Sequence, residues 1–303
     1  MNKKLQTIIN RALEDTKANS MAPVTIAALE KRLSEELDWL DACPGREGLI
    51  ILLTDLSHKL RAASGGYSFL PDSFLLYLTG VTSVNPVHWD LPFSRFTRSV
   101  HDDAEIPFET CQDKLDTARK VLSNRENELV VETEPGLFEV TFIEGELLQR
   151  VRIRIVVHEG KGNFCNVDER ILRIFGRGDT DGAVGFESDK MREWLTEFGP
   201  ESMSDLVLLN ALYWPGRIKL YPEIFGRKQN PGGIPSTGNA AADRILRDSY
   251  GILVYQEQAL LLDEIGYPVD VPFKDLAPKG HCIGQTMVAA AGLWYKSRHT
   301  SLR

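Results

Sequence analysis

Three stretches decide the fold expected for the second half of this sequence: GDTDGAVGFESDKMREW at residues 178–194, DLVLLNALYWPG at residues 205–216 and DSYGILVYQEQ at residues 248–258. Apolar residues recur at helical spacing in and around these stretches. Helices are therefore predicted at residues 188–198, 203–212 and 256–264. The first stretch is also rich in glycine, which permits a close approach of the backbone to a phosphate group.

In order and approximate spacing, these stretches resemble the fingers domain of the α subunit of bacterial DNA polymerase III, the C-family replicative polymerase. That family uses aspartate-bound magnesium to join nucleotides, and its fingers form part of the pocket over the incoming nucleoside triphosphate. The positions that the resemblance implies for nucleotide binding are Gly178, Asp179, Phe186, Glu187, Ser188, Tyr213, Arg217, Tyr255 and Gln256.

These residue types fit such a pocket, but they also fit a scaffold. Tyr213 and Tyr255 could stack on a base. In the alternative interpretation Ser188 is the N-cap of a helix, Phe186 lies in the core and Tyr255 is buried. The family commonly has arginine at the position of Trp214, and tryptophan cannot replace that charge. Arg217, three residues later, is the residue that would compensate.

Residues 49–96 resemble the start of the family's palm, through LLYLTGV at 75–81 and FSRF at 93–96. The resemblance then implies a pair of metal-binding aspartates in the stretch that follows. An alignment without gaps places Ile106 and Phe108 at those two positions. Asp103 and Glu105 have the i, i+2 spacing that two ligands on one strand require, and they are the only candidate catalytic residues. Because Pro107 is a poor residue for a central strand, the stretch is predicted to be a solvated acidic loop.

A basic stripe stands where the family presents its third aspartate. Arg150, Arg152 and Arg154 alternate with apolar residues, and no aspartate occurs between Asp116 and Asp168. On a strand the three arginines share one face, where they either contact nucleic-acid phosphates or form a solvated surface. Arginines repel magnesium, so all three metal ligands are expected to be absent and no metal site is predicted.

The composition narrows the class of protein. The chain has 303 residues and a net charge of −8, whereas an autonomous nucleic-acid binder usually carries a basic face. Its four cysteines form no CxxC pair, which disfavours zinc and redox sites. The first residues lack a signal-peptide pattern and no apolar run is long enough to span a membrane, so a cytoplasmic protein is expected.

Together these observations predict an α+β fold, helix-rich with a small antiparallel sheet. The expected organisation is a helical N-terminal segment at residues 1–45, a degenerate palm-like region at 46–165 and a mostly helical fingers-like region at 166–303. The expected function is that of a truncated homologue of the α subunit, linked to DNA replication or repair, without polymerase activity. Two alternatives stay open, a regulatory module that binds nucleotide or DNA and an active nucleotidyltransferase with relocated ligands.

No cofactor is expected, except Mg²⁺ if the chain is active. The expected partners are DNA or a nucleoside triphosphate, and other replication subunits.

Overall fold

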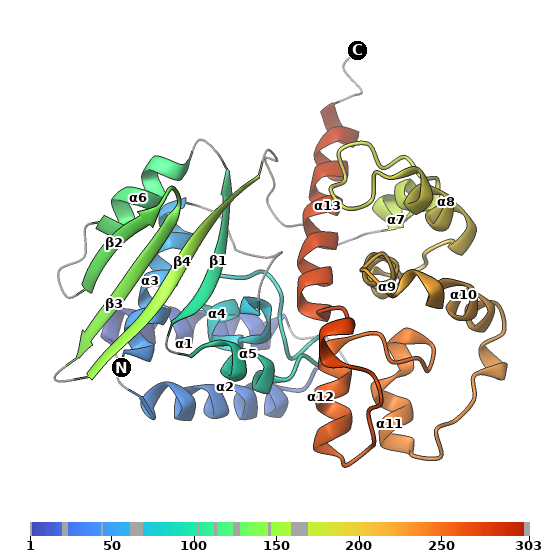
Figure 1. Ribbon diagram of the computed structural model, residues 1–303, viewed down its shortest axis with the longest axis horizontal. Helices are drawn as coiled ribbons and strands as arrows, with labels where there is room; N and C mark the ends of the chain where they lie inside the picture. Colours follow the sequence, from blue (N-terminus) through green and yellow to red (C-terminus); the bar gives the residue numbers. More distant parts are fainter. Residues whose placement is uncertain are drawn as a thin grey trace. The chain divides into compact units, whose positions relative to one another are not determined.

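A computed structural model describes residues 2–19, 24–43, 45–60, 69–101, 103–111, 114–123, 128–144, 147–158 and 169–299. The chain divides into two compact units, Met1–Lys161 and Gly162–Arg303, each of which is described by itself. The predicted α+β class is confirmed: helices dominate the described residues, and the small sheet among them lies in the first unit (Figure 1). Within the described residues, no helix is both long and apolar enough to cross a membrane.

The first unit begins with helices and then forms a four-stranded sheet. The helices are α1 (Lys3–Ala18), α2 (Ile26–Asp41), α3 (Arg46–Leu60), α4 (Phe74–Leu78), α5 (Phe93–Ser99) and α6 (Leu115–Ser123). The strands are β1 (Ala104–Cys111), β2 (Glu128–Glu134), β3 (Leu137–Glu144) and β4 (Leu147–His158), in the order β1-β4-β3-β2. Strands β2, β3 and β4 are antiparallel neighbours, whereas β1 is parallel to β4. The predicted small antiparallel sheet is therefore present as β2, β3 and β4, and the one correction to it is that the parallel strand β1 makes the described sheet mixed.

A second correction concerns the acidic stretch after residue 102. Residues Ala104–Cys111 form strand β1 and not a solvated loop. Proline is tolerated here because β1 is an edge strand of the described sheet: Pro107 opposes Arg154 on one side, and no described strand lies on the other. The apolar residues of β1 point away from solvent, and both Ile106 and Phe108 are fully buried.

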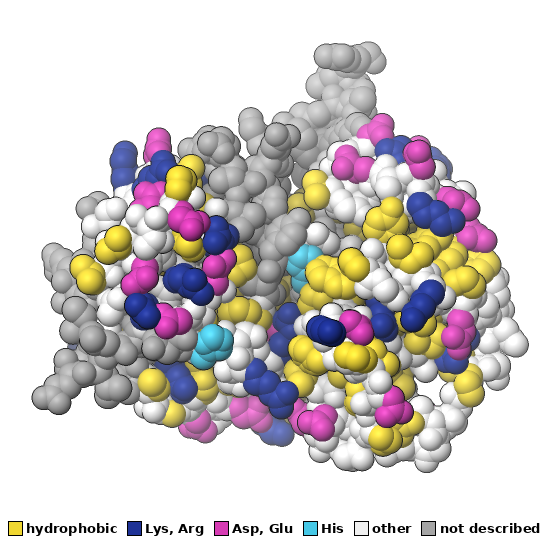
Figure 2. Space-filling model, in the orientation of Figure 1, with side chains coloured by type: hydrophobic (Ala, Val, Ile, Leu, Met, Phe, Trp, Pro, Cys, Tyr) yellow, Lys and Arg dark blue, Asp and Glu magenta, His cyan; other side chains and the backbone are white. Residues whose placement is uncertain are grey.

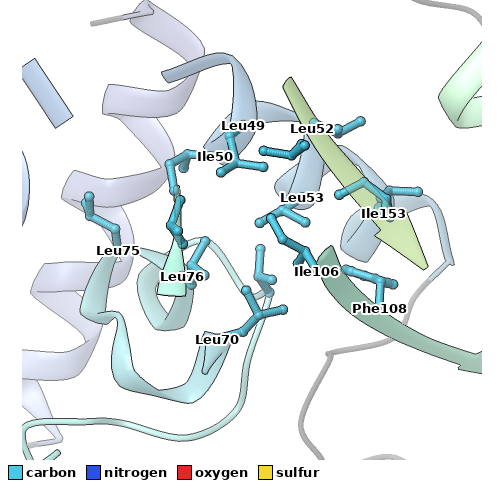
Figure 3. Close-up of a cluster of buried hydrophobic side chains, with 14 of the residues drawn as sticks. Leu49, Ile50, Leu52, Leu53, Leu70, Leu75, Leu76, Ile106, Phe108 and Ile153 are labelled. Carbon is cyan, nitrogen blue, oxygen red and sulfur yellow. The ribbon is translucent and has the colours of Figure 1, made fainter. Parts of the chain in front are cut away.

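One face of this sheet packs on the helices. Figure 3 shows Ile106 and Phe108 of β1 and Ile153 of β4 facing side chains of α3 such as Leu49 and Leu53. These side chains are all fully buried, and removing that apolar area from water is the main force that joins sheet to helices. Because side chains alternate along a strand, the neighbouring residues of β1 and β4 form the opposite face.

The second unit is helical in its described part. Its helices are α7 (Glu169–Gly176), α8 (Asp189–Phe198), α9 (Met203–Leu212), α10 (Tyr221–Gln229), α11 (Ala240–Ile245), α12 (Gln256–Glu264) and α13 (Lys279–His299). The long helix α13 packs against α9 and α7 (Figure 1). Asn210 of α9 joins these helices, since its side-chain amide donates to the Cys282 carbonyl (3.3 Å) and to Gln285 Oε1 (3.0 Å) of α13.

Candidate nucleotide- and phosphate-binding sites

The glycine-rich loop between α7 and α8 is held by its own hydrogen bonds. Gly178 has a φ of +73°, which only glycine adopts at little cost, and its N–H donates to the Phe175 carbonyl (2.8 Å). Thr180 is fully buried and its hydroxyl donates to the Phe186 carbonyl (2.6 Å). Asp179 is exposed. A β-carbon at Gly178 would lie 3.3 Å from Thr196 Oγ1, so the loop packs against α8.

The FES segment that follows leads into helix α8. Phe186 is fully buried and contacts Phe175 edge to face, with ring centroids 5.0 Å apart. Ser188 is the N-cap of α8, since its hydroxyl oxygen accepts from the Met191 N–H (3.2 Å). Glu187 is exposed, and its Oε1 accepts from the Gly182 N–H (2.8 Å). Ser188 therefore lies at a helix N-cap and Phe186 lies in the core, as the scaffold interpretation of these residues expects.

The first two stretches meet at a pair of hydroxyl groups. Ser188 Oγ lies 2.9 Å from the hydroxyl of Tyr213, which follows the end of α9. Tyr213 is 36% exposed, and its ring packs edge to face on Trp194 with centroids 5.9 Å apart. Of the two tyrosines considered for base stacking, Tyr213 thus has an exposed surface.

The turn after Tyr213 contains Trp214 and Arg217. The Arg217 N–H donates to the Trp214 carbonyl (3.0 Å), and Gly216 has the φ of +84° that this turn requires. Trp214 is half-buried against His281 of α13, with ring centroids 5.4 Å apart. Arg217 is only 7% exposed, and its Nε is buried without a hydrogen-bond partner.

The YQEQ segment bonds mainly to the backbone of its own unit. Tyr255 is 1% exposed, and this burial raises the pKa of its hydroxyl, so its ring has no exposed face for a base. The Gln256 amide donates to the Leu276 carbonyl (3.1 Å). Gln258 Oε1 accepts from the N–H groups of Val254 and Tyr255 (both 3.1 Å).

Glu257 of the same segment caps helix α13. Its Oε2 accepts from the Lys279 N–H (2.7 Å) and its Oε1 from the Gly280 N–H (2.9 Å), and the side chain is 1% exposed. A carboxylate at this end of a helix satisfies N–H groups that have no partner within the helix. Sequence reasoning missed this role because the two N–H groups lie more than twenty residues away along the chain.

The three arginines of the basic stripe lie on the open face of the sheet, and two of them form ion pairs with the candidate catalytic residues. Arg150 binds Asp103 through its Nε and through Nη2 (2.9 Å to Oδ2), and its Nη1 lies 3.4 Å from Glu139. Arg154 binds Glu105 through its Nε and through Nη2 (3.3 Å). These hydrogen bonds lower the pKa of both carboxyl groups, which are therefore ionised at neutral pH.

Arg152 lies between these two pairs. It stands opposite Glu105 on β1 and Glu139 on β3. Its Nη2 donates to the Asp103 carbonyl (3.2 Å), and its Nε is buried without a hydrogen-bond partner. The stripe is thus largely neutralised by its own carboxylates. On the face of each unit that Figure 2 shows, acidic and basic side chains are interspersed in the same way.

Among the described residues, no three histidine, cysteine, aspartate or glutamate side chains converge as a metal site would require. The gap-free alignment with the palm places apolar Ile106 and Phe108 at the two ligand positions, and both are buried in the core. Asp103 and Glu105 lie on the solvent side and bind guanidinium groups instead.

Comparison with known proteins gives one family match. Residues 153–266 match the model of the bacterial DNA polymerase III alpha subunit finger domain. This part of the chain is homologous to that finger domain. The match contains all three stretches with which the sequence analysis began, and it confirms the resemblance that they indicated.

Similar proteins are α subunits of DNA polymerase III. The chain is 33% identical over 95 residues to that of Staphylococcus epidermidis, a segment that covers 31% of this chain and 9% of the relative. It is 39% identical over 94 residues to that of Xylella fastidiosa strain 9a5c, covering 30% and 8%, and 31% identical over 93 residues to that of Staphylococcus aureus strain Mu50, covering 31% and 9%. The matched segment therefore spans less than a tenth of the length of these relatives.

Proposed function

We propose that this finger-domain homologue is a replication-linked protein that binds the phosphates of DNA or of a nucleoside triphosphate without metal-dependent nucleotide addition. One observation carries the proposal: Arg150 and Arg154 form ion pairs with Asp103 and Glu105, the two candidate metal ligands. The proposal places the protein in the cytoplasm, with other replication subunits as partners and with no cofactor.

Metal-dependent transfer of a nucleotide needs carboxylates that are free to hold the ions. Asp103 and Glu105 have the correct spacing on β1, but a guanidinium group neutralises each of them and occupies both oxygens. A divalent ion would have to displace two arginines whose own charge repels it. This geometry favours a binding protein without catalytic activity over an active nucleotidyltransferase.

Among the implied positions other than Arg217, the nucleotide-facing role is assigned to the residues that solvent reaches. Tyr213 is the proposed stacking residue because part of its ring is exposed, and Asp179 and Glu187 lie on the exposed side of the neighbouring loop. Five of the other positions implied for nucleotide binding have structural roles. Gly178, Phe186, Ser188, Tyr255 and Gln256 each take part in a turn, a helix cap, the core or a backbone contact.

The double substitution Asp103→Asn, Glu105→Gln separates the two interpretations. If Asp103 and Glu105 only form ion pairs with arginines, the variant leaves Arg150 and Arg154 without these partners and binds duplex DNA more tightly than the wild type. Two additional phosphate contacts steepen the slope of log K against log salt by about 1.8. Over the range from 200 to 50 mM salt the gain in affinity then grows by about twelvefold.

The matched control is Asp263→Asn, Asp270→Asn, which makes the same change in charge at exposed positions of the second unit. Binding is measured by fluorescence anisotropy, and primer extension is assayed in parallel with Mg²⁺ or Mn²⁺. Primer extension by the wild type that the double variant loses would overturn the proposal in favour of the nucleotidyltransferase. The absence of any DNA or triphosphate binding by the wild type would remove the binding function.

A further inference from the structure

Arg217 is a buried cation that has no counter-ion among the described residues. It is 7% exposed, its Nε is buried without a hydrogen-bond partner, and within the described chain its side chain makes no ion pair or hydrogen bond. A buried guanidinium group that leaves an N–H without a hydrogen-bond partner costs about 1–3 kcal/mol in typical proteins. Such a group calls for a partner that the described residues do not provide.

The other buried cations of the same unit have carboxylate partners. Lys228, with a side chain 10% exposed, lies 3.0 Å from Asp205 Oδ2. Lys279, with a side chain 9% exposed, lies 3.2 Å from Asp248 Oδ2. Each of these two lysines has a carboxylate partner, and Arg217 differs from both in this respect.

The turn that carries Arg217 is well fixed. Its ends are joined by the bond from the Arg217 N–H to the Trp214 carbonyl, and Trp214 packs on His281 in the first turn of α13. The N-terminus of α13 does not offer free donors at Lys279 and Gly280, because Glu257 already binds both N–H groups. A ligand at this turn would therefore depend on the guanidinium group of Arg217.

We infer that Arg217 is a binding site for a phosphate group. A guanidinium group offers a planar pair of donors that matches two phosphate oxygens, and it remains charged at every physiological pH. The choice of phosphate over another oxyanion rests on the function proposed above. The phosphate belongs either to a nucleoside triphosphate or to the backbone of DNA, and these two sources are distinguished by experiment.

The test compares Arg217→Met and Arg217→Lys with the control Lys219→Met, which removes a positive charge at an exposed position two residues away. The full chain is titrated by calorimetry with tripolyphosphate, with dATP and with a short DNA duplex, all without divalent metal. Arg217→Met is expected to weaken binding about 10- to 100-fold, Arg217→Lys less, and Lys219→Met less than twofold. Loss with dATP and tripolyphosphate identifies a triphosphate site, whereas loss with the duplex alone identifies a backbone site.

Thermal unfolding in phosphate-free buffer supplies a second measurement. Methionine fills a similar volume without a charge, so Arg217→Met is expected to melt at the same temperature as the wild type or higher. A lower melting temperature would show that Arg217 stabilises the fold and would overturn the inference. Equal binding by the wild type and Arg217→Met, or no binding of any of the three probes, would overturn it as well. The absence of binding by the wild type would remove both proposals, whereas equal binding by the wild type and Arg217→Met, or a lower melting temperature of Arg217→Met, would overturn only the assignment to Arg217.

Discussion

Replacing Glu257 by glutamine is expected to loosen the start of helix α13. The carboxylate accepts two backbone N–H groups at 2.7 and 2.9 Å, from Lys279 and Gly280, and it is 1% exposed. Hydrogen bonds to a charged group contribute about 1.5–3 kcal/mol each. Glutamine keeps one neutral acceptor and turns an amide N–H toward the other donor. The free energy of unfolding of this unit should therefore fall by about 2–4 kcal/mol.

Hydrogen exchange followed by mass spectrometry measures this effect where it arises. Peptides that begin at Lys279 should exchange about 30- to 1000-fold faster in Glu257→Gln than in the wild type, which is that free energy expressed as a rate ratio. The control is Asp263→Asn, which removes the same charge from an exposed position of the same helix, α12. Exchange in Glu257→Gln that matches this control would refute the assignment of Glu257 as a helix cap.

Two further predictions concern other carboxylates. Asp205 is 7% exposed and accepts hydrogen bonds from Lys228 Nζ (3.0 Å) and from the Tyr250 hydroxyl (3.0 Å). Because Asp205→Asn leaves Lys228 without its counter-ion, the free energy of unfolding in urea should fall by about 3–5 kcal/mol. A fall below about 1 kcal/mol would contradict this. The carboxyl groups of Asp103 and Glu105 should titrate below the ordinary values of aspartate and glutamate in a carbon-detected NMR titration, because arginines favour their charged forms. A lowered pKa means that the folded state binds a proton at these carboxyl groups less tightly than the unfolded state does. These pairs therefore contribute stability at neutral pH, and the contribution is lost as the pH falls through the lowered pKa values. Titration of both carboxyl groups at their ordinary pKa values would argue against the ion pairs.

Much of the second unit could be predicted because its signals are local. The hydroxyl of Ser188 caps a helix that begins at the next residue, and Phe186 lies within a loop whose glycines mark its turns. Such contacts span only a few residues, so residue type and spacing indicate them. The homology over residues 153–266 was indicated in the same way, by short stretches in the correct order.

The first unit was harder to predict because its decisive contacts are not local. The sequence predicts a loop where β1 lies because Pro107 disfavours a central strand. It does not indicate that β1 lies at an edge of the sheet and pairs in parallel with β4. The same pairing brings Arg150 and Arg154 to Asp103 and Glu105, nearly fifty residues away. An acidic pair and a basic stripe are each visible in the sequence, but that they neutralise each other follows only from the parallel register.

The polar residues within the homologous stretches bear on how far homology predicts activity. Thr180 and Ser188, and likewise Gln256, Glu257 and Gln258, bond to backbone groups of the finger-like unit. These residues have structural roles in the fold, whether or not a nucleotide binds beside them. The similarity of these stretches to the finger domain therefore supports common descent and does not by itself predict catalytic activity. Whether the chain catalyses a reaction depends on the sheet of the first unit, where arginines form ion pairs with the candidate carboxylates. Whether it binds phosphate depends on Arg217, whose charge has no partner among the described residues.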